Sequence, residues 1–205
     1  MVFATSRVGE KEGRCAVKVA DVRDFWNGQK EIKVLDPNIT ACREKRDLMK
    51  QYREAGALLD FTQGLDIRLL DDDDIADLNA MRLRSVHFAW DRTSDELGDA
   101  FARYAAKSTQ KPHGRFGEVY ILTNYDDCTT AEHVERALHR IYTVSALGFD
   151  PYLMIYNKPG ADRELVRLQQ WCNSVAFHAV KDFRDFNPKM AQRKKTVPEN
   201  ESLFD

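Results

Sequence analysis

The sequence lacks several patterns that would reveal a function directly. Its four cysteines, Cys15, Cys42, Cys128 and Cys172, are far apart and form no CxxC pair. In a cytosolic protein this spacing indicates reduced, mostly structural thiols, whereas a zinc or iron–sulfur site built from them has no support. No glycine-rich phosphate loop follows any predicted strand, which counts against the nucleotide-binding doubly wound fold.

Long apolar runs and a strong charge of one sign are also missing. No run is long enough to span a bilayer, and the first residues lack the layout of a signal peptide. The net charge of −2 gives no overall field that would attract nucleic acid or an acidic membrane. With 205 residues, of which 43% are hydrophobic and 31% charged, the chain can form one sizeable folded domain. We therefore expect a cytoplasmic protein with no membrane or nucleic-acid partner.

Hydrophobic periodicity predicts strands that alternate with helices along the chain. Such alternation is typical of parallel strands with helical crossovers, so the fold class is α/β: a parallel (β/α) barrel, complete or partial, or a doubly wound sheet. We expect about five βα units in one domain, residues 1–187, followed by a flexible polar tail, 188–205. The expected strands are 32–36, 64–70, 85–90, 118–124 and 151–157, neighbours in that order, and the expected helices are 19–28, 41–56, 71–84, 93–109, 129–148 and 161–177.

Several residues are predicted to begin or end these helices. Thr40 is expected to cap the helix at 41–56 and Gly56 to end it, while Thr93 or Ser94 is expected to cap the helix at 93–109. The four aspartates 71–74 precede a helix, where the helix dipole favours negative charge. A calcium site is the alternative, but the EF-hand spacing is absent.

The stretch "DFTQGLDIRLL", residues 60–70, combines strand periodicity with charged side chains. If it is one strand, Asp60, Thr62, Asp66 and Arg68 share one face, and apolar residues occupy most of the other. We expect Asp66 and Arg68 to point to the concave side of the sheet, where the polar face would line a ligand pocket. The alternative is a structural Asp–Arg pair.

The carboxyl ends of the predicted strands are unusually polar, and ligands of α/β folds bind at these ends. Singly, these residues also have structural interpretations: His87 as a packed histidine, Trp90 as core and Asp91 as a helix cap. The repetition of polar ends on all five strands favours a site. The ends carry Asp36, Asn38, Asp66, Arg68, His87, Trp90, Asp91, Asn124, Tyr125, Tyr156, Asn157 and Lys158.

Five segments resemble those of the radical S-adenosylmethionine (radical SAM) enzymes, in a branch that occurs in bacteria and their phages. The resemblance covers roughly residues 8–187. It implies a six-stranded partial barrel of which this chain supplies strands two to six. The segments are "GQKEIKVLDPNITAC", "DFTQGLDIRLL", "VHFAWD", "YILTNYDD" and "GFDPYLMIYNKP".

The resemblance implies contacts between the strand ends and S-adenosylmethionine. "LDPN" falls where the family contacts the methionine end of this cofactor, and "GLDIRLL" falls on the strand whose polar residues face cofactor and substrate. "VHFAWD" falls on the strand with contacts to the ribose or the methionine carboxylate. The expected cofactor-binding residues are Asp36, Asn38, Asp66, Arg68, His87, Asp91, Asn124 and Tyr156.

The chain departs from the family at its defining motif. CxxxCxxC, whose thiolates hold a four-iron, four-sulfur cluster, is absent, and "MVFATSR" stands before the segment "VGEKEGRC". The sequence resembles a member without its first strand and cluster loop, as a truncated, misannotated or split gene would give. We expect the cluster to be absent from this chain, and we expect a partner chain, self-association or residues 1–18 to cover the strand edge at 31–36.

Three functions remain open at this point. The resemblance implies reductive cleavage of S-adenosylmethionine to a 5′-deoxyadenosyl radical, which takes hydrogen from an unknown substrate. The chain alone, without the cluster, is not expected to carry out this chemistry, and the second alternative is a cluster-free barrel module that binds a small polar or nucleotide-like ligand. The third alternative is a conventional barrel enzyme with Asp66, His87 or Asp91 as acid–base groups.

Overall fold

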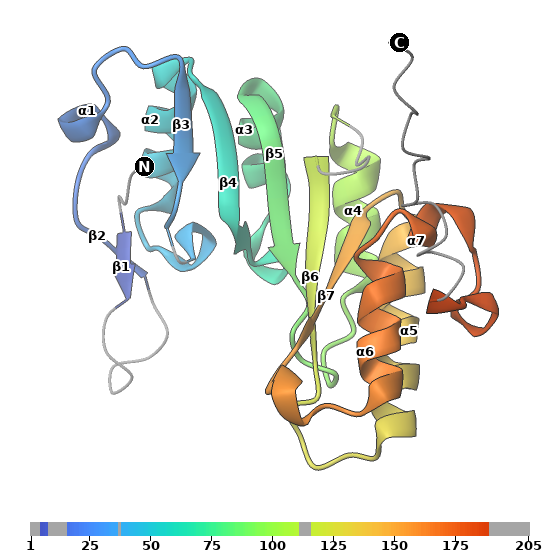
Figure 1. Cartoon of the computed structure of the whole chain (residues 1–205). Coiled ribbons are helices and arrows are strands. Elements are labelled where there is room, and N and C mark those ends of the chain that lie inside the picture. Colours follow the sequence, from blue (N-terminus) through green and yellow to red (C-terminus); the bar gives the residue numbers. More distant parts are fainter. Residues whose placement is uncertain (1–4, 8–15, 37, 111–115, 189–205) are drawn as a thin grey trace, which may run out of the picture.

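The chain folds around a five-stranded, all-parallel sheet whose strands lie side by side in chain order (Figure 1). The computed structural model describes residues 5–7, 16–36, 38–110 and 116–188. The prediction of five neighbouring parallel strands is confirmed. The strands are β3 (Glu31–Val34), β4 (Leu58–Leu65), β5 (Arg82–Ala89), β6 (Gly117–Thr123) and β7 (Asp150–Ile155).

Helices follow each strand, and short elements fill the connections. The main helices are α2 (Lys45–Ala55), α3 (Asp72–Ala80), α4 (Gly98–Lys107), α5 (Thr130–Ala146) and α6 (Arg163–Cys172). The short elements are β1 (Thr5–Arg7), β2 (Ala16–Lys18), α1 (Val22–Phe25), α7 (Ala176–Ala179) and the 3-10 turns η1 (Ile39–Ala41), η2 (Ile67–Leu69), η4 (Lys158–Gly160) and η5 (Phe183–Asp185).

The hydrophobic core lies between the helices and one face of the sheet. Phe61 of β4 packs edge-on against Tyr52 of α2, and Phe88 of β5 packs in the same way against Phe101 and Tyr104 of α4. Every second residue of a strand points to the same face, so the same alternation buries the inner residues of β6 and β7. These buried strand residues are Leu59, Phe61, Val86, Phe88, Val119, Ile121 and Leu153.

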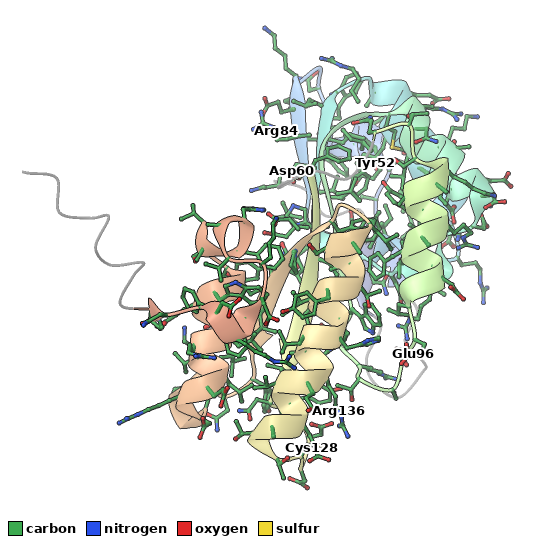
Figure 2. All side chains as sticks on the ribbon, turned by 90° about the vertical axis from the view of Figure 1, so that its right-hand side faces the viewer. Tyr52, Asp60, Arg84, Glu96, Cys128 and Arg136 are labelled. Atoms are coloured by element: carbon green, nitrogen blue, oxygen red, sulfur yellow. The ribbon has the colours of Figure 1, made fainter. Side chains whose placement is uncertain are left out.

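The opposite face of the sheet is polar and partly open to solvent. In Figure 2, Asp60 and Arg84 lie on the side of the strands away from the helices that cover the core, whereas Tyr52 lies among those helices. Lys33 and Arg84 each keep 53% of their side-chain surface exposed on this face. We call it the open face.

β4 lies earlier in the chain than the strand predicted at 64–70 and shares only Gly64 and Leu65 with it. The strand stops at Leu65, and Asp66 begins the turn η2 instead of continuing a strand to residue 70. Gly64 has φ of +84°, and the pairing with β5 shifts register between Phe61 and Leu65. Past this point the period of two is lost, so the expectation that Asp66 and Arg68 share a strand face with Asp60 is wrong.

Two predicted helix starts are wrong and others are confirmed. The helix predicted at 41–56 begins only at Lys45, with Glu44 at its N-cap, so Thr40 does not cap it; Asn38 caps the separate short turn η1. α4 begins at Gly98 rather than after Thr93. Gly56 does end α2, with φ of +64°. The aspartate run caps α3, since the Asp71 side chain accepts a hydrogen bond from the Asp74 N–H.

The outer edge of β3 has no strand partner among the described residues. β1 and β2 pair with each other in a separate antiparallel sheet, and Lys18 forms an ion pair with Asp47 of α2 at 2.5 Å. Most of the segment 1–18 that was expected to cover this edge, and residues 189–205 of the predicted tail, lie outside the described residues. None of the helices in the described ranges is long and apolar enough to cross a membrane.

Candidate functional site

The end of β3 carries Asp36, whose environment is a buried pair. Asp36 is 3% exposed and accepts a hydrogen bond from the hydroxyl of Tyr52 on α2 at 3.1 Å. Burial, and then the charge of Asp36, raise the pKa of Tyr52 well above its ordinary value. The carboxylate is thereby joined to the helix layer and lies apart from the open face.

Asn38 connects the ends of β3 and β4 through Thr40. The Asn38 Oδ1 accepts hydrogen bonds from the Thr40 hydroxyl at 2.6 Å and from the Ala41 N–H at 3.3 Å. The Thr40 hydroxyl in turn accepts one from the Asp66 N–H at 3.1 Å. Local capping therefore brings Asn38 and Asp66 into one hydrogen-bonded chain.

Asp66 and Arg68 form a two-pronged ion pair beyond the end of β4. Arg68 donates from Nε to Asp66 Oδ1 at 2.8 Å and from Nη2 to Oδ2 at 2.7 Å. Its Nη1 donates to Asp95, in the loop after β5, at 2.9 Å. The hydrogen bonds to Asp66 raise the pKa of Arg68. The structural Asp–Arg pair is thus present, at the strand end rather than on a strand face.

Asp91 lies close to this ion pair. Asp91 is an exposed residue, yet partial desolvation of its carboxyl group raises its pKa. The charges of Arg140 and Arg68 oppose this rise. Its backbone carbonyl accepts a hydrogen bond from Arg140 Nη1 at 3.3 Å. The predicted residues at the ends of β3, β4 and β5 are therefore neighbours, apart from Asp36 and His87.

Asn124 and Tyr156 meet at the ends of β6 and β7. Asn124 adopts φ of +62°, a conformation that asparagine tolerates better than most residues, and donates from Nδ2 to the carbonyl of Tyr156 at 3.0 Å. Tyr156 itself is 60% exposed.

His87 belongs to a different group, in the middle of the open face. We call Asp60, Ser85, His87, Glu118 and Tyr120 the open-face cluster. Ser85 donates its hydroxyl hydrogen to Asp60 Oδ1 at 2.5 Å, and Ser85 Oγ lies 3.2 Å from His87 Nε2. The other ring nitrogen, Nδ1, lies 2.6 Å from the Tyr120 hydroxyl and 3.2 Å from Glu118 Oε2.

The open-face cluster is only partly desolvated. The side chains of Asp60, His87 and Glu118 are 19%, 13% and 19% exposed. Lys33 approaches Asp60 to 3.9 Å. Desolvation, followed by the negative charge of Glu118, raises the pKa of Tyr120 to about 12, so its hydroxyl keeps its hydrogen at neutral pH.

Strand pairing assembles the open-face cluster, and the sequence reasoning missed most of it. His87 is opposite Glu118, and Asp60 is opposite Ser85 after a register shift at Arg84. Asp60 had been noted on a polar strand face and His87 among the strand-end residues, whereas Ser85, Glu118 and Tyr120 were missed. The available signal was the spacing of two in Ser85–His87 and Glu118–Tyr120, which places each pair on one side of its strand.

A cavity of about 260 Å³ lies between the loop after β5 and α5, next to the strand-end residues: its lining includes Asp95, which accepts from Arg68, and Arg140, which donates to the Asp91 carbonyl. It is lined by Trp90, Glu96, Arg136 and His139, among others; Figure 2 labels two of these, Glu96 and Arg136. None of the predicted cofactor-binding residues lines it.

The described thiols do not fit an iron–sulfur cluster. Cys42 is buried beside Glu44, and Cys172 is buried on α6, where it donates to the carbonyl of Pro151 at 3.4 Å. Desolvation raises the pKa of Cys172 to about 12 and also raises that of Cys42, whereas cluster ligation needs thiolates. Cys15 lies outside the described residues. The part of the chain that the structure describes contains no group of three His, Cys, Asp or Glu side chains placed to hold a metal ion.

No family model, curated protein or solved structure matches the chain. The radical SAM resemblance therefore rests on the sequence segments given above and on no independent comparison.

Proposed function

We propose that the chain is a partial (β/α) barrel of the radical SAM type whose open face binds a small polar or nucleotide-like ligand. The observation that carries the proposal is the connected polar cluster on a parallel sheet face that remains partly open to solvent. A parallel sheet is usually covered on both faces, and its strands are then apolar on both sides. Here the side chains of the second face are polar and linked across β4, β5 and β6.

The order of the strands supports the barrel interpretation. Each of the five strands pairs only with its chain neighbours in the sheet, as in a (β/α) barrel, whereas a doubly wound sheet reverses its strand order at a switch point. The open face would then correspond to the interior of the barrel. The proposed ligand would reach from the cluster toward the strand ends that carry Asn38, Asp66 and Arg68.

The lineage chemistry requires a four-iron, four-sulfur cluster, which supplies the electron that cleaves S-adenosylmethionine. The described thiols do not provide such a site, so the proposal for this chain is binding rather than radical formation.

Binding of S-adenosylmethionine and S-adenosylhomocysteine by isothermal titration calorimetry tests the proposal. We expect weak binding, with dissociation constants on the order of 0.1–1 mM, because the open iron that anchors the amino and carboxylate groups in the family is lacking. Arg68→Gln should weaken binding several-fold, whereas Arg53→Gln, an exposed ion-paired arginine on α2, should not change it. Equal dissociation constants for the Arg68→Gln and Arg53→Gln variants would contradict the proposal, and so would the absence of binding of both S-adenosylmethionine and S-adenosylhomocysteine.

Acid–base chemistry on the open face is a second candidate function. It is favoured by one observation, the contact of the His87 ring with a hydroxyl on each side and with the Glu118 carboxylate. A histidine oriented by a carboxylate is a common arrangement in general acid–base catalysis. Turnover without reductant that is lost in His87→Gln would distinguish this candidate from a binding module.

A further inference from the structure

We propose that the outer edge of β7 is a strand-binding surface that α6 keeps closed, and that a second copy of the chain pairs with this edge when the side chains of Gln169 and Asn173 no longer cover it. The inference goes beyond the proposed function, because it concerns an edge of the sheet and not its ligand-binding face.

β7 is the last strand of the sheet, and backbone groups on its outer side bond to side chains at α6, which lies beside it (Figure 1). The N–H of Leu153 donates to Asn173 Oδ1 at 2.8 Å. The carbonyl of Leu153 accepts from Gln169 Nε2 and from Asn173 Nδ2, each at 2.9 Å. Two amide side chains therefore take both of the groups that Leu153 would offer to a neighbouring strand.

Pro151, two residues earlier on the same edge, closes it further. Proline has no N–H, so it cannot donate to a strand ladder. The carbonyl of Pro151 accepts a hydrogen bond from the Cys172 thiol of α6 at 3.4 Å. Pro151 and Leu153 thus offer no free N–H to a pairing strand, and both of their carbonyls are already hydrogen-bonded.

The strand that α6 covers in this way has the composition of one that pairs readily. The segment "PYLMI", residues 151–155, carries no charge, and Tyr152 and Met154 are 41% and 44% exposed. An uncharged edge strand with exposed apolar side chains is a template for another strand, and folded proteins commonly protect such edges. The contacts from α6 supply this protection.

The segment is also complementary to itself, which is why we assign the partner as a second copy. In an antiparallel pair of two β7 strands centred on Leu153, the two Leu153 residues would exchange N–H and carbonyl hydrogen bonds. Tyr152 of one copy would then lie opposite Met154 of the other, on one face of the joined sheet. Contacts between a thioether and an aromatic ring are favourable across strands.

Removal of the two amides tests the inference, with association of the whole chain followed by sedimentation velocity. We expect Gln169→Ala/Asn173→Ala to associate at concentrations about tenfold lower than the parent chain. Amide exchange of Leu153 is the second readout: in dilute samples its N–H should exchange about tenfold faster than in the parent chain, and exchange should slow again as the variant associates.

Asn79→Ala is the matched control. The Asn79 side chain of α3 also joins two backbone groups, since it donates to the Lys107 carbonyl at 3.0 Å and accepts from the Thr109 N–H at 2.9 Å, but these groups belong to the helix layer. Its loss should leave association unchanged. Met154→Lys, added to the double variant, places a charge on the exposed side of β7 and should reverse the association.

Urea unfolding shows whether each variant is folded. If the double variant does not fold, Asn173→Ala alone, which frees the Leu153 N–H, takes its place in the same comparison. A folded variant that associates no more than the parent chain would overturn the inference. Equal association of Asn79→Ala, or association that persists after Met154→Lys, would overturn it as well, because the β7 edge would then not be the surface involved.

Discussion

Arg140 of α5 carries a buried charge where the ends of β5 and β6 meet. The residue is 2% exposed, and its Nη1 donates to the carbonyls of Trp90 at 2.8 Å and Leu122 at 3.0 Å. Desolvation lowers the pKa of Arg140, yet a guanidinium remains charged at neutral pH. Arg140→Met should lower the free energy of unfolding by about 3 kcal/mol, because it leaves buried carbonyls without a donor. Urea unfolding measures this, and Arg136→Met, one turn earlier on the same helix with a side chain that is 41% exposed, should cost less than about 1 kcal/mol. Equal costs would mean that the buried charge does not hold the strand ends.

The buried hydrogen bond between Tyr52 and Asp36, at the end of β3, is expected to stabilise the fold. Tyr52→Phe removes the hydroxyl that donates to Asp36 at 3.1 Å and leaves a buried carboxylate with fewer donors. We expect a loss of about 1–3 kcal/mol in the free energy of unfolding. Tyr156→Phe, the same change on a tyrosine that is 60% exposed, should alter stability by less than about 0.5 kcal/mol. If thermal unfolding shows no difference between the two variants, the pair does not stabilise the fold.

At the scale of elements, the aspartate run before α3 shows how one cap begins a helix. The Asp71 side chain accepts from the Asp74 N–H at 3.0 Å, and this bond, together with Arg46, lowers the pKa of Asp71. A lowered pKa means that the stabilisation is complete above the unfolded value near 3.9 and is lost as the pH falls through the folded value. Asp71→Ala should therefore cost about 1 kcal/mol at pH 7, and the difference from the parent chain should shrink below about pH 4. Asp73→Ala, an exposed aspartate in the same turn, is the control. A cost that does not change with pH would contradict this role of the Asp71 charge.

Four of the five strands were predicted to within three residues of their observed bounds, because apolar periodicity depends on each segment alone. The end of β4 was missed, since the conformation of Gly64 and the turn begun by Asp66 override a continuing alternation. The start of α4 was also missed, because tertiary contacts such as the hydrogen bond from Trp90 Nε1 to the Asp95 carbonyl hold residues 91–97 as a loop.

The candidate site was only partly predictable, for a related reason. Local turns join Asn38, Asp66 and Arg68, and these residues were expected together at the strand ends. The open-face cluster depends on the pairing of β4 with β5 and of β5 with β6. A register shift at Arg84 brings Ser85 opposite Asp60, and no single strand reveals that shift.

At the scale of the whole molecule, the cysteine positions predict how the chain responds to iron. Cys42 and Cys172 are buried in separate parts of the fold, and Cys128, in the loop before α5, accepts a hydrogen bond from Arg136 at 2.9 Å. Anaerobic reconstitution with iron and sulfide should load far fewer than about four irons per chain, since a site-bound cluster needs several converging thiolates. Iron counting, with an assay for 5′-deoxyadenosine under reducing conditions, checks this. Near-stoichiometric loading with 5′-deoxyadenosine formed would mean that the thiols come together.

The central claim for the whole molecule is that the open face of the sheet is its ligand-binding surface. NMR of the complete chain during titration with S-adenosylhomocysteine tests it most directly, because the shifts report on every strand at once. The claim predicts shifts concentrated on the open face and the adjoining strand ends, at residues such as Asp60, His87, Glu118 and Arg68, with those of the helix-facing Phe61 and Phe88 smaller. Shifts confined to the cavity beside α5, or no shifts at millimolar ligand, would contradict it.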